Sequence, residues 1–560
     1  MSDKKRILIV GGVAGGASCA ARARRLSETA EIVMFDRGPY VSFANCGLPY
    51  YVGNVIKKEE NLLVATPELF RQRFNIDVRL RSEVASIDRA KRIIQVNDLE
   101  NGTTYSEAYD VLVLSPGALP IRPPLPGIDM PGIFSVRTIP DSRLIREWID
   151  QYEAKQVLVV GGGYIGMEMT ENLHKRKLNV TLVEKQPQVM PLLDPEMVAP
   201  VHSTLVKHRV DLLLNNSVVR FDQGNGHRIV VTLESGRSLE TDLVILCIGV
   251  RPDTSLAKAA GLTISDSGGI WVDAHMRTSD PHIWAVGDAV EVRDLLSGQA
   301  GVVPLAGPAN RQGRIAADTI MGRASAFRGV QGTSVVGILD HVAAFTGASE
   351  KTLKRLGLWE EMEKIYLHPG HHAAYYPGAS PITLKLIFTK KEGRIVGAQA
   401  VGEKGVEKRI DVIAMAIQKN ATVFDLEEAE LCYAPQFGSA KDPINMAGMI
   451  AANVLRGDAH IAHWEDLDDN ADDHAPLILD VRDEMEYKAD HVEDAIHMPL
   501  DEIRQRMDEL PKDREIWAYC FVGQRSYYAA RSLSQYGFNV KNISGGFKSF
   551  LLHEAVKYLG

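Results

Sequence analysis

The sequence repeats one pattern of strand, glycine loop, helix and strand, and this repeat restricts the fold more than any other feature. The first copy spans residues 6–37 and the second spans residues 156–184. In each copy the second apolar run ends in an acidic residue. A glycine loop before a helix lets backbone N–H groups approach a pyrophosphate, and the acidic residue accepts hydrogen bonds from ribose. The repeat predicts an α/β fold with two dinucleotide-binding domains.

The second copy follows the dinucleotide pattern in full, and it predicts the nicotinamide site. Its three glycines are Gly161, Gly163 and Gly166, and Glu184 ends the next strand. A carboxylate at that position repels a 2′-phosphate, so we expect NADH as the reductant. Lys185 follows directly and could accept the phosphate, which keeps NADPH open.

The first copy departs from the pattern, because Val13 stands where the second glycine is expected. Two other features support a nucleotide here. Asp36 stands at the ribose position, and a late apolar strand, residues 283–286, ends in Gly287-Asp288. A carboxylate at such a strand end suits the ribityl chain of a flavin. The predicted FAD-binding residues are Gly11, Val13, Ala14, Gly15, Gly16, Asp36, Arg37, Gly287 and Asp288.

Cys46 lies beyond the first glycine loop, in the stretch Ser-Phe-Ala-Asn-Cys-Gly-Leu-Pro of residues 42–49. No second cysteine follows at the close spacing of an internal redox pair. The thiolate is the reactive form, and a thiol pKa of about 8.5 must be lowered for work at neutral pH. Cys46 precedes an expected helix start, whose dipole would help. We predict a redox-active cysteine whose partner sulfur comes from outside this motif.

Composition excludes several other classes of protein. The chain has 560 residues, a formal net charge of −9 and 5 cysteines. The charge argues against a nucleic-acid binder. No apolar run reaches the roughly 18 residues of a membrane span. Few, scattered cysteines without metal-ligand spacing favour a reducing, cytoplasmic location and no metal site.

The C-terminal part contains a second cysteine loop, Cys520 to Arg525, between an apolar strand and a helix. Such a loop forms a cup of backbone N–H groups that stabilises a thiolate, and Arg525 could hold a sulfonate or a phosphate. With Asp480 and Gly545-Gly546 the segment resembles a single-domain rhodanese. Tyrosine phosphatases share the loop spacing but carry a histidine before the cysteine, where this chain has Tyr519.

The paired nucleotide units, with residues 115–118, 249–253 and 287–288, resemble the flavoprotein disulfide reductases. Within that superfamily, Ser42-x-x-x-Cys46-Gly47 is similar to coenzyme A disulfide reductases and persulfide reductases. It also resembles NADH oxidases and peroxidases with one active cysteine. The resemblance implies FAD, a nicotinamide nucleotide, coenzyme A and a homodimer in which each subunit completes the opposite site.

The same resemblance assigns roles to individual residues. Tyr433 matches a tyrosine that reaches the active cysteine of the partner subunit, and Tyr375 or Tyr376 matches a second. Asn310 stands where some relatives carry histidine. Arg22 and Arg25 share one helix face, whereas Arg24 points elsewhere. The coenzyme A contacts implied are Ser18, Arg22, Arg25, Ser42, Asn45, Asn310 and Lys441.

Together these features predict five segments and one reaction class. The expected reaction is NAD(P)H-dependent reduction of coenzyme A persulfide, polysulfide or coenzyme A disulfide at Cys46, with Cys520 handling sulfane sulfur. The alternative is an NADH oxidase or peroxidase that cycles Cys46 through sulfenic acid. The expected segments are an FAD domain at 1–150 and 278–325, an NAD(P)H domain at 151–277, an α+β dimerisation domain at 326–455, a linker at 456–475 and an α/β rhodanese domain at 476–560.

Overall fold

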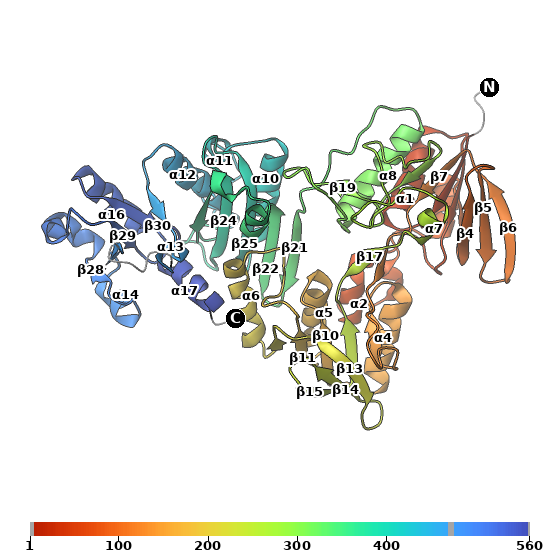
Figure 1. Ribbon diagram of the computed structural model, residues 1–560, viewed down its shortest axis with the longest axis horizontal. Coiled ribbons are helices and arrows are strands. Elements are labelled where there is room, and N and C mark those ends of the chain that lie inside the picture. The colour runs from red at the N-terminus through yellow and green to blue at the C-terminus, as the bar shows by residue number, and fades with distance from the viewer. Residues whose placement is uncertain (1–4, 469–474, 558–560) are drawn as a thin grey trace. The chain divides into compact units, whose positions relative to one another are not determined.

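The computed structural model describes residues 5–468 and 475–557, which fold into two compact units (Figure 1). The first unit comprises Met1–Val183 and Asn216–Val330. The second comprises Glu184–Asn215 and Gln331–Gly560. The chain therefore leaves the first unit, returns to it and leaves it again.

The first unit contains the first predicted nucleotide-binding sheet, which is parallel throughout in the order β18-β7-β1-β2-β3. Side chains alternate between its faces, as strand geometry requires. Ile7 and Ile9 pack with α1 (Ala14–Leu26) and α8 (Ala306–Ile320), whereas Leu8 packs on the opposite face. The strands are β1 (Arg6–Val10), β2 (Glu31–Phe35), β3 (Asp77–Arg79), β7 (Val111–Leu114) and β18 (Ile283–Ala285).

The second nucleotide-binding sheet holds four parallel strands of this unit, in the order β11-β10-β16-β9. Its strands are β11 (Asn179–Val183), β10 (Gln156–Val160), β16 (Leu243–Leu246) and β9 (Ile133–Ser135), and its helices are α4 (Ile139–Gln151) and α5 (Tyr164–Lys175). The fold class predicted from the repeat is thereby confirmed.

The chain passes between the two sheets of the first unit along an antiparallel ribbon. The ribbon pairs β8 (Ala118–Pro120) with β17 (Val250–Pro252). After β8, β9 and α4 already belong to the second sheet, although they lie within the predicted 1–150 segment. After β17, Leu262 and Ile270 pack in the core of the first sheet, although they lie within 151–277.

Smaller elements complete the first unit. Two three-stranded meanders are present, β4-β5-β6 and β13-β14-β15. The remaining bounds are α2 (Leu48–Val52), α3 (Pro67–Phe74), β4 (Ser82–Asp88), β5 (Ile93–Asp98), β6 (Thr103–Ala108), β13 (Val218–Gln223), β14 (Ile229–Leu233), β15 (Ser238–Thr241), α7 (Ser255–Ala259), β19 (Val292–Arg293) and β20 (Ala300–Gly301).

The second unit contains an antiparallel sheet in the order β21-β22-β25-β24-β23. The helix α10 covers β22 and β25, and α6, from the segment expected in the NAD(P)H domain, packs against β25. The bounds are α6 (Pro195–Lys207), β12 (Asp211–Leu213), β21 (Ser334–Ile338), β22 (His341–Gly347), α9 (Glu350–Arg355), β23 (Met362–Leu367), β24 (Ile382–Thr389), β25 (Ile395–Gly402), α10 (Val406–Gln418), α11 (Val423–Glu427) and α12 (Pro443–Leu455).

A second sheet of this unit is parallel, in the order β26-β30-β29-β27-β28. Its edge strand β26 lies inside the predicted linker 456–475, so the C-terminal domain takes in part of that segment. Residues 469–474 of the linker lie outside the described residues. The bounds are β26 (Ile461–Ala462), α13 (Glu465–Asp468), β27 (Leu477–Asp480), α14 (Glu484–Ala489), β28 (Ile496–His497), α15 (Ile503–Arg506), β29 (Ile516–Tyr519), α16 (Gln524–Gln535), β30 (Val540–Ile543) and α17 (Gly546–Lys557).

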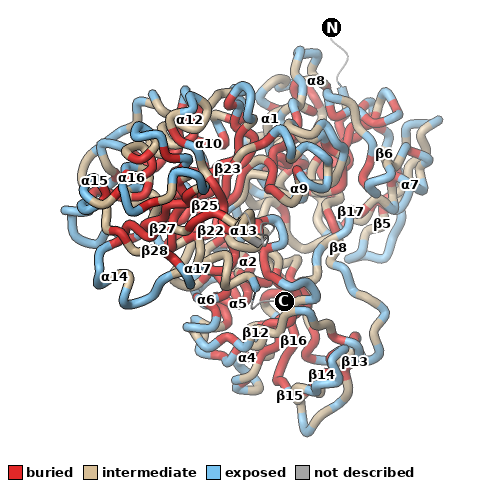
Figure 2. Tube along the Cα trace, turned by 60° about the vertical axis from the view of Figure 1, so that its left-hand side comes forward, coloured by how far each residue is buried: buried red, intermediate tan, exposed pale blue. Residues whose placement is uncertain are grey.

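The two sheets of the second unit are joined by buried polar contacts. The Tyr366 backbone N–H donates to Ser544 Oγ at 2.9 Å, and His368 Nε2 lies 3.1 Å from Ser549 Oγ. Glu465 forms an ion pair with Lys364. Figure 2 shows buried residues concentrated along the strands of these sheets. Across the described ranges, no helix is long and apolar enough to cross a membrane.

Candidate active sites

The first glycine loop has the shape that a pyrophosphate needs. Gly11 has φ +94°, and a Cβ there would lie 2.1 Å from Ser115 O. A Cβ on Gly16 would lie 1.9 Å from Gly11 O. Val13 has a negative φ of −95°, so this position does not need the left-handed backbone that favours glycine.

Two acidic residues flank this loop at the positions that the sequence indicates. The Asp36 carboxylate accepts hydrogen bonds from the N–H groups of Gly12 and Gly38 at 3.0 and 2.8 Å, and burial raises its pKa. Arg37 lies 3.4 Å from Asp253. Asp288, which follows the left-handed Gly287, lies 3.4 Å from Arg137 Nη2.

The second loop repeats this geometry. Gly161 has φ +106°, and a Cβ on it would lie 2.5 Å from Cys247 O. A Cβ on Gly166 would lie 1.9 Å from Gly161 O. Gly163 instead faces open space, with nothing within 4 Å of its position for a Cβ. That space is where the backbone of such loops approaches the pyrophosphate. Glu184 accepts a hydrogen bond from the Gln186 N–H at 2.8 Å.

Cys46 is exposed and lies in a short 3-10 turn, Asn45–Gly47, directly before the five-residue helix α2. Its surroundings do not lower the thiol pKa, contrary to the expectation from a helix dipole. Partial desolvation of the thiol raises the pKa of Cys46, and the Glu168 and Asp288 carboxylates raise it further. Arg137 and a backbone N–H lower it by less. The chain alone therefore favours the thiol over the thiolate.

Glu168 is a site residue that the sequence reasoning missed. It lies on α5, two residues after Gly166, and accepts a hydrogen bond from Tyr50 OH at 3.4 Å. Burial raises the pKa of Glu168 to about 7. The sequence signal that could have pointed to Glu168 is its place as an acidic residue in the first turns of the second nucleotide-binding helix. Its charge connects the second βαβ unit electrostatically to Cys46.

The structure brings some of the predicted coenzyme A contacts together. Ser18 Oγ donates to Asn310 Oδ1 at 2.5 Å, and Arg22 Nη2 pairs with Asp318 at 2.7 Å, which joins α1 to α8. Arg25 and Lys441 are exposed. Arg24 is buried, as its predicted orientation requires, and donates to the carbonyl oxygens of Phe74, Ser27, Glu28 and Asn75.

The remaining contacts lie next to Cys46. Ser42 has φ +48°, and its backbone N–H donates to Gly12 O at 2.8 Å, which fixes it beside the first glycine loop. The Asn45 amide fits Arg137 by donating to its carbonyl and accepting from Nη1, each at 3.0 Å. The Ser42 backbone and the Asn45 side chain are therefore both held near the Cys46 loop.

Tyr375 and Tyr433 form one exposed pair in the second unit. Their hydroxyl oxygens lie 2.5 Å apart, and this hydrogen bond raises the pKa of Tyr433. Tyr375 is 75% exposed and Tyr433 is 46% exposed. Tyr376 instead packs edge-on against His372 at 5.5 Å. Of the two candidates for the second tyrosine, Tyr375 is the one that meets Tyr433.

Cys520 lies at the carboxyl end of β29 and is almost fully buried. Its Sγ accepts hydrogen bonds from the Gly523 N–H at 3.2 Å and the Ser526 hydroxyl at 3.5 Å. A Cβ on Gly546 would lie 2.2 Å from Cys520 O, so the glycine pair closes the back of the loop. Arg525 donates through Nη1 and Nη2 to the two carboxylate oxygens of Glu486, each at 2.7 Å, so this cation is already engaged.

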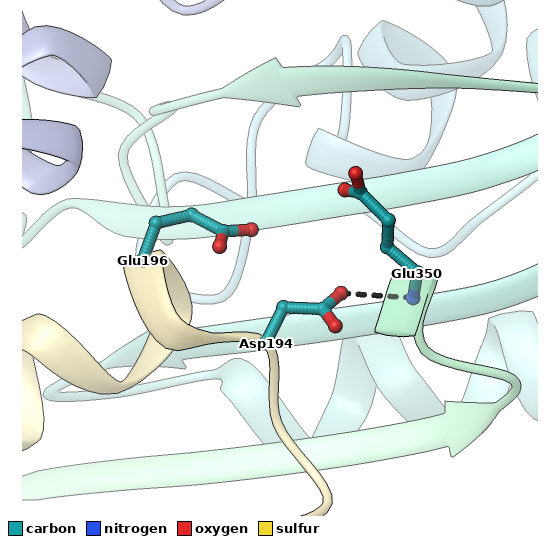
Figure 3. Close-up of side chains that lie close together, drawn as sticks. All are labelled: Asp194, Glu196 and Glu350. Carbon is teal, nitrogen blue, oxygen red and sulfur yellow. Dashed lines mark hydrogen bonds between the residues drawn. The ribbon is translucent and has the colours of Figure 1, made fainter. Parts of the chain in front are cut away.

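Three carboxylates in the second unit lie as close together as the ligands of a metal ion. Asp194, Glu196 and Glu350 place oxygen atoms within 4.8 Å of one another, and Figure 3 shows Asp194 accepting the Glu350 N–H. Lys385 Nζ donates to all three, at 2.8, 2.6 and 2.7 Å. The buried ammonium takes the place that a metal cation would occupy.

Comparison with known proteins decides the family. A family model described as pyridine nucleotide-disulphide oxidoreductase matches residues 5–313, and the dimerisation domain of that family matches residues 333–442. A rhodanese-like domain matches residues 463–553. The chain belongs to the pyridine nucleotide-disulphide oxidoreductases.

Several oxidoreductases of known name are similar to the chain. A coenzyme A disulfide reductase from Staphylococcus epidermidis is 37% identical over 444 residues, 79% of this chain and 99% of that protein. A reduced CoADR-RHD from Bacillus anthracis is 47% identical, with a TM-score of 0.95 over 99% of this chain and 98% of its own. An NAD-dependent persulfide reductase from A. fulgidus is 34% identical, with a TM-score of 0.89 over 97% of this chain and 100% of its own.

Membership in the pyridine nucleotide-disulphide oxidoreductases confirms the predicted fold class, the enzyme class and the cofactors FAD and NAD(H). Both glycine loops fit such groups, because each has the tight turn and the second has open space at Gly163. The C-terminal resemblance to a rhodanese is confirmed as well.

The charge on Glu168 makes the reactivity of Cys46 testable by pH. Because the carboxylate raises the pKa of Cys46, the substitution Glu168→Gln should lower that pKa. The rate of Cys46 alkylation by iodoacetamide, followed against pH, should therefore rise at lower pH in the variant. Glu60→Gln, which neutralises an exposed carboxylate of the same unit, should leave the profile unchanged. An unchanged profile in Glu168→Gln would show that this carboxylate does not act on Cys46.

Proposed function

We propose that this oxidoreductase uses NAD(P)H to reduce the S–S bond of coenzyme A persulfide, polysulfide or coenzyme A disulfide at Cys46, while Cys520 handles sulfane sulfur. One observation carries the proposal. An exposed cysteine without a disulfide partner lies in the unit that holds the two nucleotide loops, in a chain that also matches a rhodanese-like domain. The second sulfur of the reaction must then come from the substrate.

The reaction at Cys46 is a thiol–disulfide exchange. The Cys46 thiolate attacks one sulfur of the substrate, the S–S bond breaks, and the other sulfur leaves as a thiolate or as sulfide. The sulfur that was attacked stays on Cys46 as a mixed disulfide. Bound FAD would supply the two electrons from NADH that break this S–S bond, which returns Cys46 to the thiolate and releases the attached group as a thiolate. Because the chain alone raises the thiol pKa, the bound substrate and cofactor would have to favour the thiolate.

The cations that would bind the phosphates of coenzyme A come from two parts of the chain. Arg25 is exposed on the helix that follows the first glycine loop, and Arg22 lies one turn earlier in its ion pair with Asp318. A phosphate would compete with Asp318 for that guanidinium. Lys441 would come from the second unit of a partner subunit. We infer a cytoplasmic homodimer, whose exposed Tyr375 and Tyr433 hydroxyls would protonate the leaving thiolate.

Nicotinamide specificity stays a prediction of this proposal. We expect NADH to be preferred because Glu184 carries a negative charge at the end of β11, with NADPH accepted to a lesser degree through Lys185.

The alternative, an NADH oxidase or peroxidase, has its own support. A water-forming NADH oxidase from Lactobacillus brevis is 27% identical, with a TM-score of 0.76 over 81% of this chain and 99% of its own. A lone exposed cysteine also suits oxidation to sulfenic acid.

Turnover of NADH with four acceptors separates these functions. We expect rates with polysulfide or coenzyme A disulfide to exceed those with peroxide or oxygen by about a hundredfold or more, since differential transition-state binding sets such ratios. Turnover that is fastest with oxygen or peroxide would instead establish the alternative.

A further inference from the structure

The cysteine loop of the rhodanese domain carries one cation. Between Cys520 and Arg525 the residues are Phe, Val, Gly and Gln, so Arg525 supplies the only charge of the loop side chains. A donor that ends in a sulfonate needs a guanidinium or a comparable set of charge-assisted donors. Whether Arg525 is free for that task therefore determines which sulfur donors the loop accepts.

Arg525 is not free. Its two terminal nitrogens donate to the two oxygens of Glu486 at 2.7 Å each, in the bidentate arrangement that carboxylates form with arginine. This hydrogen bonding lowers the pKa of Glu486 to about 2, so the pair is ionised at neutral pH. The hydrogen bonds with Glu486 raise the pKa of Arg525, and so does the contact of Arg525 with Cys520. The guanidinium therefore lies beside the Cys520 sulfur.

Two other cations, Arg482 and Lys548, belong to the surroundings of the loop. Arg482 is buried in an ion pair with Asp480 at 2.6 Å. Lys548 approaches the loop through its backbone N–H, which donates to Phe521 O at 2.9 Å. Burial lowers the pKa of Lys548, and its charge contributes to the lowered pKa of His368 in the neighbouring sheet.

Part of the exposed edge of the loop is apolar, although Gln524 is exposed as well. Phe521 is 42% exposed, and Val522 is partly exposed beside it. Such an edge suits the carbon chain of an organic thiol better than a hydrated inorganic dianion, whose desolvation would lack compensation.

We propose that the Glu486–Arg525 ion pair sets the donor class of the rhodanese domain, disfavouring small dianions such as thiosulfate and accepting persulfides carried on an organic thiol. This inference rests on the proposed function, in which Cys520 handles sulfane sulfur. It adds the class of donor and the residue that selects it, Glu486.

The transfer step balances without an external oxidant. The Cys520 thiolate attacks the outer sulfur of an organic persulfide R–S–SH, forming a new S–S bond at Cys520. The S–S bond of the donor breaks, and R–S⁻ leaves with its electron pair. The proton stays on the transferred sulfur, so the products are the Cys520 persulfide and a thiolate.

The test is the substitution Glu486→Gln in the full chain. Glutamine keeps an oxygen that can accept the Asp483 N–H in the capping box of α14, so the helix should survive. Persulfide formation on Cys520 is measured by mass spectrometry without NADH, with thiosulfate and with glutathione persulfide as donors. We expect the second-order rate with thiosulfate to rise about tenfold, because one negative charge next to the sulfur is removed. The rate with glutathione persulfide should change less than about twofold.

A matched control lies on the same helix. Glu484 is exposed and pairs with Lys488 at 2.6 Å, so Glu484→Gln removes an equal charge without freeing Arg525. It should leave the donor preference unchanged. Any of three results would overturn the inference. The thiosulfate rate could stay unchanged in Glu486→Gln, or it could rise equally in Glu484→Gln. It could also change in Lys548→Gln and not in Glu486→Gln.

The assay also separates this inference from the proposed function. Loading of Cys520 is read without NADH or Cys46, so a failure of polysulfide reduction at Cys46 would leave the donor preference measurable. Conversely, polysulfide reduction that proceeds while Glu486→Gln shows no change in preference would leave the proposed function standing and refute the role of Glu486.

Discussion

Replacing Cys46 with serine should lower NADH-dependent release of sulfide from polysulfide by at least about a thousandfold, because among the described residues of the first unit it removes the only exposed cysteine. A serine hydroxyl is not ionised at neutral pH and cannot form the mixed disulfide. FAD content should remain, since the loop at Gly11 and Gly16 does not involve this side chain. The measurement is sulfide release together with NADH consumption.

Two further cysteine variants sharpen this result. Cys432 is also exposed, and Cys432→Ser should keep the activity, which excludes a general effect of thiol loss. Cys520→Ser should slow turnover with sulfane-sulfur donors but not with coenzyme A disulfide, because the latter needs no rhodanese step. Full sulfide release in Cys46→Ser would contradict the assignment of the reaction to this residue.

Lys385→Met should destabilise the second unit by about 3–5 kcal/mol, the cost of breaking a buried ion pair by removing one partner. Lys385 is fully buried, and its ammonium is shared by Asp194, Glu196 and Glu350. Without it, three converging carboxylates remain without their central cation (Figure 3). Differential scanning calorimetry should show a lower transition temperature for the second unit.

The loss should depend on pH in a defined direction. Burial raises the pKa of Asp194 and of Glu350, but Lys385 and neighbouring donors lower each by more, so both lie below their usual values. A depressed carboxyl pKa contributes stability above the unfolded value of about 4, and this contribution is lost as the pH falls. The difference between wild type and Lys385→Met should therefore be largest near neutral pH and should narrow below about pH 4.

An exposed ion pair gives the control for this prediction. Lys207 pairs with Asp340 at 2.9 Å, and its side chain is 67% exposed. Lys207→Met should cost less than about 1 kcal/mol, as is usual for surface pairs. Equal losses in the two variants, or a stabilised Lys385→Met, would show that the buried cluster does not hold the second unit together.

The sequence was sufficient to predict those site residues whose roles depend on a local sequence pattern. Both glycine loops need tight turns within a few residues, so Gly11, Gly161 and Gly166 could be identified from spacing alone. Cys520 could be identified in the same way, because its Sγ accepts a hydrogen bond from the N–H of Gly523, only three residues later. The departure at Val13 is local as well, because its negative φ does not require glycine.

Features that depend on distant contacts could not be predicted in this way. Glu486 meets Arg525 across the rhodanese domain, and Lys385 meets Asp194 from far along the chain, so neither pair leaves a spacing signal. The passage of the chain between the two nucleotide-binding sheets is a related case. The β8–β17 ribbon carries the chain between two sheets in both directions, and no composition change marks it.

The measurement that tests the central claim most directly is a mass spectrum of the whole protein after exposure to coenzyme A disulfide, with and without reductant. The account predicts an added mass of one coenzyme A on the peptide that contains Cys46, lost on reduction and absent in Cys46→Ser. An oxygen adduct on Cys46 with no coenzyme A adduct, or a coenzyme A adduct confined to another cysteine, would contradict it.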